Sequence, residues 1–525
     1  DGLTDDSSAI DVTLWYSDGD SDTYGDPDTF EWACNQPANY VVDNTDCNDT
    51  TSLANPAGTE ICGDGYDNDC DGSAGICSLN GDILAAGFDG KLTGEGVNDY
   101  LGAALAGVGD INGDGYDDVI AGAYLEDYGG SSAGATYLLL GSVSGTVTAA
   151  LADGKLYGES AGDRSGESVA GAGDVNDDNF DDILIGATGD DDGGTDAGAA
   201  YLLLGPITGS ASLAINDAKL TGENSGDEAG ASVASAGDLD GDGNGDIIVG
   251  ASGYSNSAGA AYIVYGPVTG DVSLSAADAF WVGETSNDNS ADSVASLGDW
   301  DADGLADIIV GAYGDDDGGS AAGAAYIITD EGSGFSSLGS ATLKLVGEFA
   351  GDRAGYSVDG AGDVNGDGYA DAIVGAYGDD TLANNGGAAY VVFGFSGGSG
   401  SLDLSVADAK LIGPDASGEA GWSVAGLGDI EPDGYADVVI GAQGANNKAG
   451  YAYIVYGDFS GSMVLGEDGA RIMGNDSKDR IGRSVAGGGD VNGDGFLDVL
   501  LGAQGDDEAG GDSGALYLFF GMEGM

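Results

Sequence analysis

Residues 110–118 read DINGDGYDD, and the apolar run VIAGA follows directly at residues 119–123. Copies of this nonapeptide recur along the chain, and residues 363–371, for example, read DVNGDGYAD before AIVGA. Oxygen-bearing side chains stand at positions 1, 3, 5 and 9, and glycine usually stands at position 6. Oxygen ligands at this spacing, with a main-chain carbonyl at position 7, form a cage suited to calcium. The seven copies begin at Asp110, Asp174, Asp238, Asp299, Asp363, Asp429 and Asp490.

We expect each loop to hold one calcium ion, with further ions possible in the N-terminal segment. The third and fourth loops carry four carboxylates and should bind most tightly. The sixth reads DIEPDGYAD, so Glu431 and Pro432 should make it the weakest. An EF-hand is excluded, because position 12 of the first loop is Ala121, inside an expected strand. The alternative is a set of solvated hairpin turns. The predicted ligands are Asp110, Asn112, Asp114, Tyr116, Asp118, Asp174, Asn176, Asp178, Phe180, Asp182, Asp238, Asp240, Asp242, Asn244, Asp246, Asp299, Asp301, Asp303, Leu305, Asp307, Asp363, Asn365, Asp367, Tyr369, Asp371, Asp429, Glu431, Asp433, Tyr435, Asp437, Asp490, Asn492, Asp494, Phe496 and Asp498.

The spacing of the copies predicts the architecture. Successive loops begin 61 to 66 residues apart, and each unit reads as four short strands without helical periodicity. This pattern predicts an all-β fold: a seven-bladed β-propeller of four-stranded blades over residues 83–525. Its small-residue strands, such as residues 168–174, suit the crowded centre of a ring. A strand at residues 91–94 is expected to complete the last blade and close the ring. The alternative, a linear β-solenoid, is disfavoured because the array lacks polar caps.

The pattern GxSVAGxGDxNxDGxxDxxxGA is similar to the FG-GAP repeats of integrin α-subunit propellers and their bacterial relatives. The resemblance covers residues 83–525 and implies a seven-bladed propeller with calcium in the loops between the first two strands of its blades. Two departures weaken the likeness: the Phe-Gly pair is degenerate, as at Leu101 and Gly102, and the Pro of GAP is missing. An integrin-like ligand therefore does not follow. In place of that Pro stand Tyr124, Thr188, Ser252, Tyr313, Tyr377, Gln443 and Gln504.

Composition excludes several functions. Acidic residues outnumber basic ones 92 to 12, which gives a formal net charge of −80. Such a chain should repel nucleic acid and anionic membranes. The absence of His excludes Ser–His–Asp triads and His-ligated zinc. No apolar run is long enough to span a membrane. The chain starts at Asp1 rather than Met, which we interpret as a mature or trimmed product.

Six of the twelve cations occupy one repeated position, the first residue of the KLxG segment or its equivalent. The regular spacing favours a structural role, with the stem on the blade and the charged head near acidic neighbours. An anion-binding ring is the alternative. The tyrosines of the repeated GAxY segments are likewise expected to pack inside the blades. The six cations are Lys91, Lys155, Lys219, Lys344, Lys410 and Arg471.

Residues 1–82 differ from the repeats and contain all five cysteines, which indicates disulfides and an oxidising compartment. This segment resembles the Cys- and Asp-rich metal-binding motif of secreted bacterial proteins. Calcium spacing at Asp18, Asp20, Asp22 and Asp26 predicts a further site, although Thr23 stands where glycine is wanted. A disulfide-stapled spacer is the alternative. Sequence proximity suggests the pairs Cys34–Cys47 and Cys62–Cys70, with Cys77 left over.

These observations favour a secreted or cell-surface calcium-stabilised propeller that binds a glycan or protein, in adhesion or matrix contact. We expect the ligand on the face opposite the metal loops, for example at residues 124–132, 190–196 and 315–320. The alternative is a subunit of a surface layer, sheath or filament that assembles with copies of itself. An enzyme is disfavoured because no convergent cluster of Tyr with Arg or Lys is visible. Neither nucleic acid nor a membrane span is expected.

Overall fold

A computed structural model describes residues 13–20, 23–27, 29–48, 50, 56, 70, 81–141, 143–329, 334–397, 399–467 and 469–521. The chain divides into two compact units, of which the larger spans Leu79–Gly521. Strand β4 (Gly81–Leu84) belongs to this larger unit, so the unit begins before residue 83, where the sequence placed the boundary.

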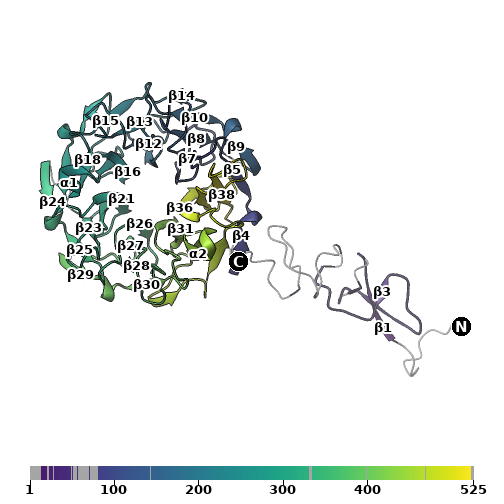
Figure 1. Ribbon diagram of the computed structural model, residues 1–525. Helices are drawn as coiled ribbons and strands as arrows, with labels where there is room; N and C mark the ends of the chain where they lie inside the picture. The colour runs from purple at the N-terminus through teal and green to yellow at the C-terminus, as the bar shows by residue number, and fades with distance from the viewer. Residues whose placement is uncertain are drawn as a thin grey trace. The chain divides into compact units, whose positions relative to one another are not determined.

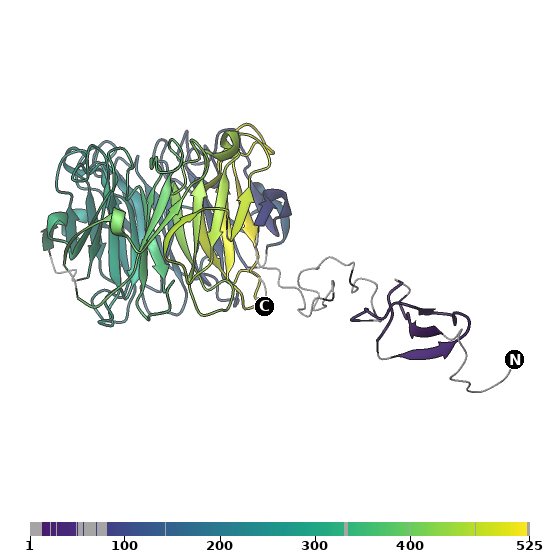
Figure 2. The same ribbon diagram turned by 90° about the horizontal axis from the view of Figure 1, so that it is seen from below.

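In the larger unit the described residues form seven five-stranded sheets, arranged as a ring around a central axis (Figure 1). Figure 2 shows the strands running along this axis, with loops gathered at the two ends of the ring. The innermost strands are rich in Ser, Ala and Gly because neighbouring sheets approach closely there: a Cβ on Gly426 would lie 2.3 Å from the carbonyl oxygen of Gly360. The inner strands are β6 (Ala104–Gly107), β11 (Ser168–Gly173), β16 (Ala229–Gly237), β21 (Ser290–Gly298), β26 (Ser357–Gly362), β31 (Ser423–Gly428) and β36 (Ile481–Gly489).

The second and third strands of each sheet are apolar and almost entirely buried, because both faces pack against neighbouring sheets. One core cluster, for example, joins Ile373 and Val391 of one sheet to Val438 and Ile440 of the next. The second strands are β7 (Val119–Ala123), β12 (Asp182–Ala187), β17 (Asp246–Ala251), β22 (Asp307–Ala312), β27 (Asp371–Ala376), β32 (Asp437–Ala442) and β37 (Asp498–Ala503). The third strands are β8 (Ala135–Leu139), β13 (Ala199–Leu203), β18 (Ala260–Val264), β23 (Ala324–Ile328), β28 (Ala388–Val392), β33 (Tyr451–Val455) and β38 (Ala515–Phe519).

The fourth strands carry the KLxG segments, and a fifth strand pairs with each in parallel. The prediction of four strands missed this outer strand, which is short, polar and largely exposed. The fourth strands are β5 (Gly90–Thr93), β10 (Gly154–Tyr157), β15 (Ala218–Thr221), β20 (Ala279–Val282), β25 (Leu343–Val346), β30 (Ala409–Ile412) and β35 (Ala470–Met473). The fifth strands are β4, β9 (Gly145–Thr148), β14 (Ala211–Ser212), β19 (Val272–Ser273), β24 (Gly334–Ser337), β29 (Gly400–Asp403) and β34 (Gly461–Val464).

The ring closes as the sequence predicted. Strand β5 pairs antiparallel with β38, so that Lys91 lies opposite Tyr517. Strand β4 pairs with β35 of the preceding sheet. Closure by an N-terminal strand rules out the linear solenoid and confirms the all-β propeller. The described helices are single turns: α1 (Tyr254–Ser257), α2 (Ala445–Lys448), η1 (Ala85–Gly87), η2 (Ala149–Leu151), η3 (Leu274–Ala276), η4 (Leu338–Ser340) and η5 (Leu404–Val406).

The smaller unit contains a three-stranded antiparallel sheet in the order β2-β1-β3. Its strands are β1 (Thr13–Ser17), β2 (Phe30–Ala33) and β3 (Tyr40–Val41). The indole of Trp15 donates a hydrogen bond of 3.1 Å to the carbonyl of Ala33 across this sheet.

Candidate metal loops and the opposite face

The seven acidic loops join each inner strand to the second strand, all at one end of the ring. In the first loop the Asp110 carboxylate accepts hydrogen bonds from the main-chain N–H groups of Gly113, Asp114 and Gly115, at 2.6, 3.0 and 2.8 Å. The bond from the position-6 N–H to the position-1 carboxylate recurs in all seven loops. Each position-1 Asp therefore folds its loop around its own side chain.

The aspartate at position 5 has a second repeated role. Asp114 Oδ1 accepts from the N–H of Tyr116 at 3.1 Å, and the equivalent bond recurs in every loop. This bond turns the position-7 residue so that its N–H is satisfied inside the loop. The sixth loop keeps the same folding despite Glu431 and Pro432, since Asp429 still accepts from Gly434 at 2.9 Å.

The aspartate at position 9 is fully buried in all seven loops. Asp371, for example, accepts from the N–H of Val364 at 3.0 Å and from the N–H of Gly394 at 2.8 Å. It thereby ties the loop to the end of the third strand. Burial, together with the nearby charges of Asp367 and Asp363, raises the pKa of Asp371 to about 7, against the opposing effect of these hydrogen bonds. The predicted ligand at position 9 is thus also a structural residue.

In the third and fourth loops three predicted carboxylate ligands converge. Carboxylate oxygens of Asp238, Asp240 and Asp246 lie within 4.8 Å of one another. The same holds for Asp299, Asp301 and Asp303 in the fourth loop. Converging carboxylate oxygens are the donor set that a hard cation such as calcium prefers, and the like charges repel one another without one. The residues therefore fit calcium in the loops where the sequence predicts the tightest binding.

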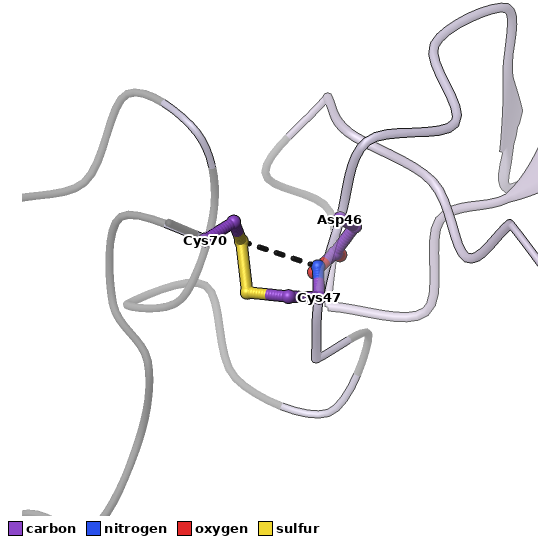
Figure 3. Close-up of side chains that lie close together, drawn as sticks. All are labelled: Asp46, Cys47 and Cys70. Carbon is purple, nitrogen blue, oxygen red and sulfur yellow. Dashed lines mark hydrogen bonds between the residues drawn. A yellow bond between two sulfur atoms is a disulfide. The ribbon is translucent and has the colours of Figure 1, made fainter. Parts of the chain in front are cut away.

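The N-terminal predictions have mixed outcomes. Asp18 is buried and Asp20 is half-buried, whereas Asp22 lies outside the described residues. The disulfide joins Cys47 to Cys70, whose Cα atoms are 5.5 Å apart, and the N–H of Cys47 donates to Cys70 Sγ at 3.3 Å (Figure 3).

Both suggested disulfide pairs, Cys34–Cys47 and Cys62–Cys70, are therefore wrong, because proximity in sequence does not set the distance between Cα atoms. Cys34 is a free, exposed thiol at the end of β2. Cys62 and Cys77 lie outside the described residues. Asp46 lies beside the disulfide, but oxidised sulfurs are not thiolate ligands.

The repeated cations connect neighbouring sheets. Lys219 of β15 forms an ion pair with Glu159, which follows β10 of the preceding sheet. It also pairs with Asp190 at 2.8 Å and Asp192 at 2.6 Å in the loop of its own sheet. The buried Tyr201 hydroxyl donates to Glu159 and Asp190, at 3.0 and 2.8 Å. The structural interpretation is confirmed, and the sequence missed only which acids are the partners. Lys155, Lys344 and Lys410 make equivalent bridges between sheets.

The face opposite the metal loops holds the predicted ligand loops. Asp190 and Asp315, from two of these loops, are buried and pair with Lys219 and Lys344. They therefore serve the bridges between sheets. Tyr128 remains largely exposed and packs edge-on against Tyr157, with ring centroids 4.9 Å apart.

Comparison with known families agrees with this geometry. The family described as "FG-GAP repeat" matches residues 101–139, 165–203, 229–264 and 481–519. The chain carries FG-GAP repeats. The family described as "Putative metal-binding motif" matches residues 46–74 of the N-terminal segment.

Curated relatives of the FG-GAP region include integrin α-subunits. Integrin alpha pat-2 of Caenorhabditis briggsae is 38% identical over 96 residues, which are 18% of this chain and 8% of the relative. Integrin alpha-V of Gallus gallus is 31% identical over 226 residues, 41% of this chain and 20% of the relative. The chain thus spans a fifth or less of the length of these relatives.

Among solved structures, Sqt1 of Chaetomium thermophilum is 12% identical, with a TM-score of 0.41, over 82% of this chain and 97% of that one. The fold assignment rests on the sheets described above. No helix in the described part of the chain is long and apolar enough to cross a membrane.

Proposed function

We propose that this protein is a secreted or cell-surface calcium-binding propeller that recognises a macromolecular ligand and catalyses no reaction. The observation that carries the proposal is the recurrence of one acidic loop, folded by the same hydrogen bonds, around a ring that carries FG-GAP repeats. Likeness to integrin α-subunits supports an adhesion or recognition role.

Calcium would be held by the carboxylates at positions 1, 3, 5 and 9 and the carbonyl at position 7 of each loop. When bound, it would neutralise acids that otherwise repel one another at one end of the ring. The chain's own residues prepare the site: position 1 shapes the loop, position 5 orients position 7, and position 9 anchors the loop in the core. Binding should therefore stabilise the fold more than it changes the fold.

The ligand surface is proposed on the opposite face, where the loops differ from one sheet to the next. Loops on this face supply buried acids such as Asp190 to the bridges between sheets, but the loops differ from sheet to sheet, and recognition commonly uses variable loops on a rigid scaffold. Glycans, proteins and copies of this chain are the candidate ligands.

The test is molar mass by light scattering on chelator-stripped protein, before and after addition of millimolar calcium, combined with calorimetric titration of calcium. We expect heat from several high-affinity sites and a mass that stays at one chain. No saturable heat would contradict calcium binding. A mass that rises in steps or without limit would favour the self-assembling subunit instead of the recognition module.

A further inference from the structure

The twelve cations of this chain divide into two groups by their partners. All six on the repeated position make ion pairs. None of the other six makes an ion pair with any described residue, although the chain has 92 acidic residues. All of these six lie in or beside loops at the end of the ring opposite the metal loops. The unpaired cations are Arg164, Arg353, Lys448, Lys478, Arg480 and Arg483.

Two of these cations flank a cluster of aromatic rings, which we call the aromatic–arginine patch: Arg353, Tyr356, Tyr377, Trp422 and Arg483. The Trp422 ring centroid lies 4.7 Å from that of Tyr356 and 4.8 Å from that of Tyr377. The Arg483 guanidinium lies 5.3 Å from the Trp422 centroid, and that of Arg353 lies 5.2 Å from the Tyr377 centroid. The patch combines residues from three consecutive sheets.

The patch borders a cavity of about 470 Å³ at the mouth of the central channel. Tyr356, Trp422 and Arg483 line one side, together with hydroxyls of the inner strands such as Ser423. Glu167, Glu228 and Asp292 also line this cavity. The cavity therefore offers aromatic faces, hydroxyls and charges of both signs, a polar lining unlike the buried core.

A smaller cavity of about 130 Å³ adjoins the patch, and two of the residues that line it each have a buried polar atom without a hydrogen-bond partner among the described residues. It is lined by Glu419, Trp422, Gln443, Lys448 and Arg480. Gln443 is only 8% exposed, and its Nε2 donates to Glu419 at 3.2 Å, which leaves its amide oxygen as an acceptor. Within the described part of the chain, no group donates a hydrogen bond to that oxygen, and no group accepts one from the buried indole N–H of Trp422.

A buried donor and a buried acceptor without partners are unfavourable unless a ligand or water satisfies them. A hydroxyl group can do both, because it accepts from the indole N–H of Trp422 and donates to the amide oxygen of Gln443. Aromatic rings suit the apolar C–H face of a sugar ring, and a guanidinium binds a carboxylate through two parallel hydrogen bonds.

We propose that the aromatic–arginine patch and its two cavities bind an acidic saccharide. A hydroxyl would enter the small cavity, the sugar ring would stack on Trp422, and the sugar carboxylate would pair with Arg483 or Arg480. The acids across the larger cavity would repel the carboxylate and so orient the sugar. The inference rests on the proposed recognition function and names its ligand class.

The test uses calcium-loaded full-length protein and two probes: a glucuronate-terminated tetrasaccharide and the same tetrasaccharide ending in glucose. Titration calorimetry should show binding of the acidic probe at least tenfold tighter than the neutral one. Arg483→Gln and Gln443→Leu should each weaken the acidic probe tenfold or more. Lys478→Gln is the matched control, because Lys478 is an unpaired cation on the same face that lines neither cavity. Trp422→Ala is checked first for an unchanged melting temperature.

Equal affinity for the two probes would overturn the acidic-saccharide assignment. A loss of affinity for the acidic probe in Lys478→Gln as large as in Arg483→Gln would overturn it too. Binding of an Asp-containing peptide in place of both sugars would show that the patch is a protein site. No binding of either sugar would mean that only water fills the small cavity. The melting temperature with and without calcium tests the proposed function independently. If calcium still raises the melting temperature, only the saccharide proposal fails; if calcium has no effect, the proposed function is contradicted as well.

Discussion

The two ends of the propeller differ in how regularly their loops repeat. At the metal-loop end, seven loops repeat the same hydrogen bonds, and every position-9 aspartate is buried. At the other end, loops differ between sheets, short turns such as α1 and α2 occur in only some, and all the unpaired cations gather there. The difference indicates that the irregular end has loops available to contact other molecules, although its lysine bridges also join neighbouring sheets. Substitutions at the two ends should therefore have different consequences.

Removing calcium should have the largest effect. Because ligand bound only to the folded protein stabilises it, we expect EGTA to lower the melting temperature by tens of degrees relative to millimolar calcium. Near-ultraviolet circular dichroism during heating measures this. An unchanged melting temperature in EGTA would show that calcium in the metal loops does not stabilise the fold.

Breaking a bridge between sheets should rank second. Lys219→Met leaves the carboxylates of Glu159 and Asp190 without their cation, and loss of one partner of a buried pair costs about 3–5 kcal/mol. The pKa of Lys219 is raised by its hydrogen bonds to these acids, against the opposing effect of burial, so the charged lysine is favoured in the folded state. Chemical denaturation of the variant is compared with that of Lys478→Met, which should be near neutral. Similar losses in both would contradict the distinction between paired and unpaired cations.

Within one metal loop, substitutions at positions 5 and 9 should affect stability differently. Asp371→Asn replaces an acceptor of two main-chain bonds and should destabilise by about 2–3 kcal/mol even in EGTA. Asp367→Asn changes an exposed position and should matter mainly when calcium is present. The free energy of unfolding of both variants, measured by denaturant titration with and without calcium, checks this prediction. Equal effects in EGTA would show that position 9 has no structural role of its own.

The smallest effect concerns pH. Asp359 occupies an inner-strand position where the other six inner strands have Ala. Burial raises its pKa to about 7, although the N–H of Gly426 donates to it at 3.1 Å. A raised carboxyl pKa means that the folded state binds the proton more tightly, so this residue reduces stability as pH rises from about 4 through 7.

Asp359→Ala should therefore gain stability relative to the parent over that range, by about 1–2 kcal/mol at pH 8. Denaturant titrations at pH 5 and pH 8, with calcium present throughout, measure the difference. Ala234→Asp, at the equivalent position of another sheet, should lose stability with the same pH dependence. A gain for Asp359→Ala that is the same at both pH values would contradict the titration of this carboxyl.

Local pattern predicted most of the fold. The apolar run after each loop, such as residues 119–123, marks the second strand, and the early KLxG segment at residues 91–94 predicts closure. The fifth strands were not predicted because segments such as β9 are polar, four residues long and paired only with a strand of the neighbouring sheet. The disulfide was also not predicted, since only the folded chain shows that Cys47 and Cys70 are close.

The site was partly predictable for the same reason. Position 9 of each loop was found as an oxygen ligand, but its bonds to the third strand depend on residues about twenty positions away, such as Gly394 for Asp371. The patch on the opposite face was not predicted at all. Tyr356, Trp422 and Arg483 occupy the same variable position of three successive repeats, the residue between Gly and Ser-Val, but only the ring shows that this position lines one cavity.

Closure of the ring also constrains the order in which the chain can fold during synthesis. Asp89, just before β5, accepts a hydrogen bond from the N–H of Phe520, 431 residues later. Strands β4 and β5 thus emerge from the ribosome first among the propeller strands. Strand β5 can pair early with β9, but its second partner, β38, and the partner of β4, β35, are made only with the last repeats. Until then β4 and the edge of β5 that will face β38 stay unpaired and can pair with other strands. The short length of β4 and β5, four residues each, limits that exposure while the rest of the chain is synthesised.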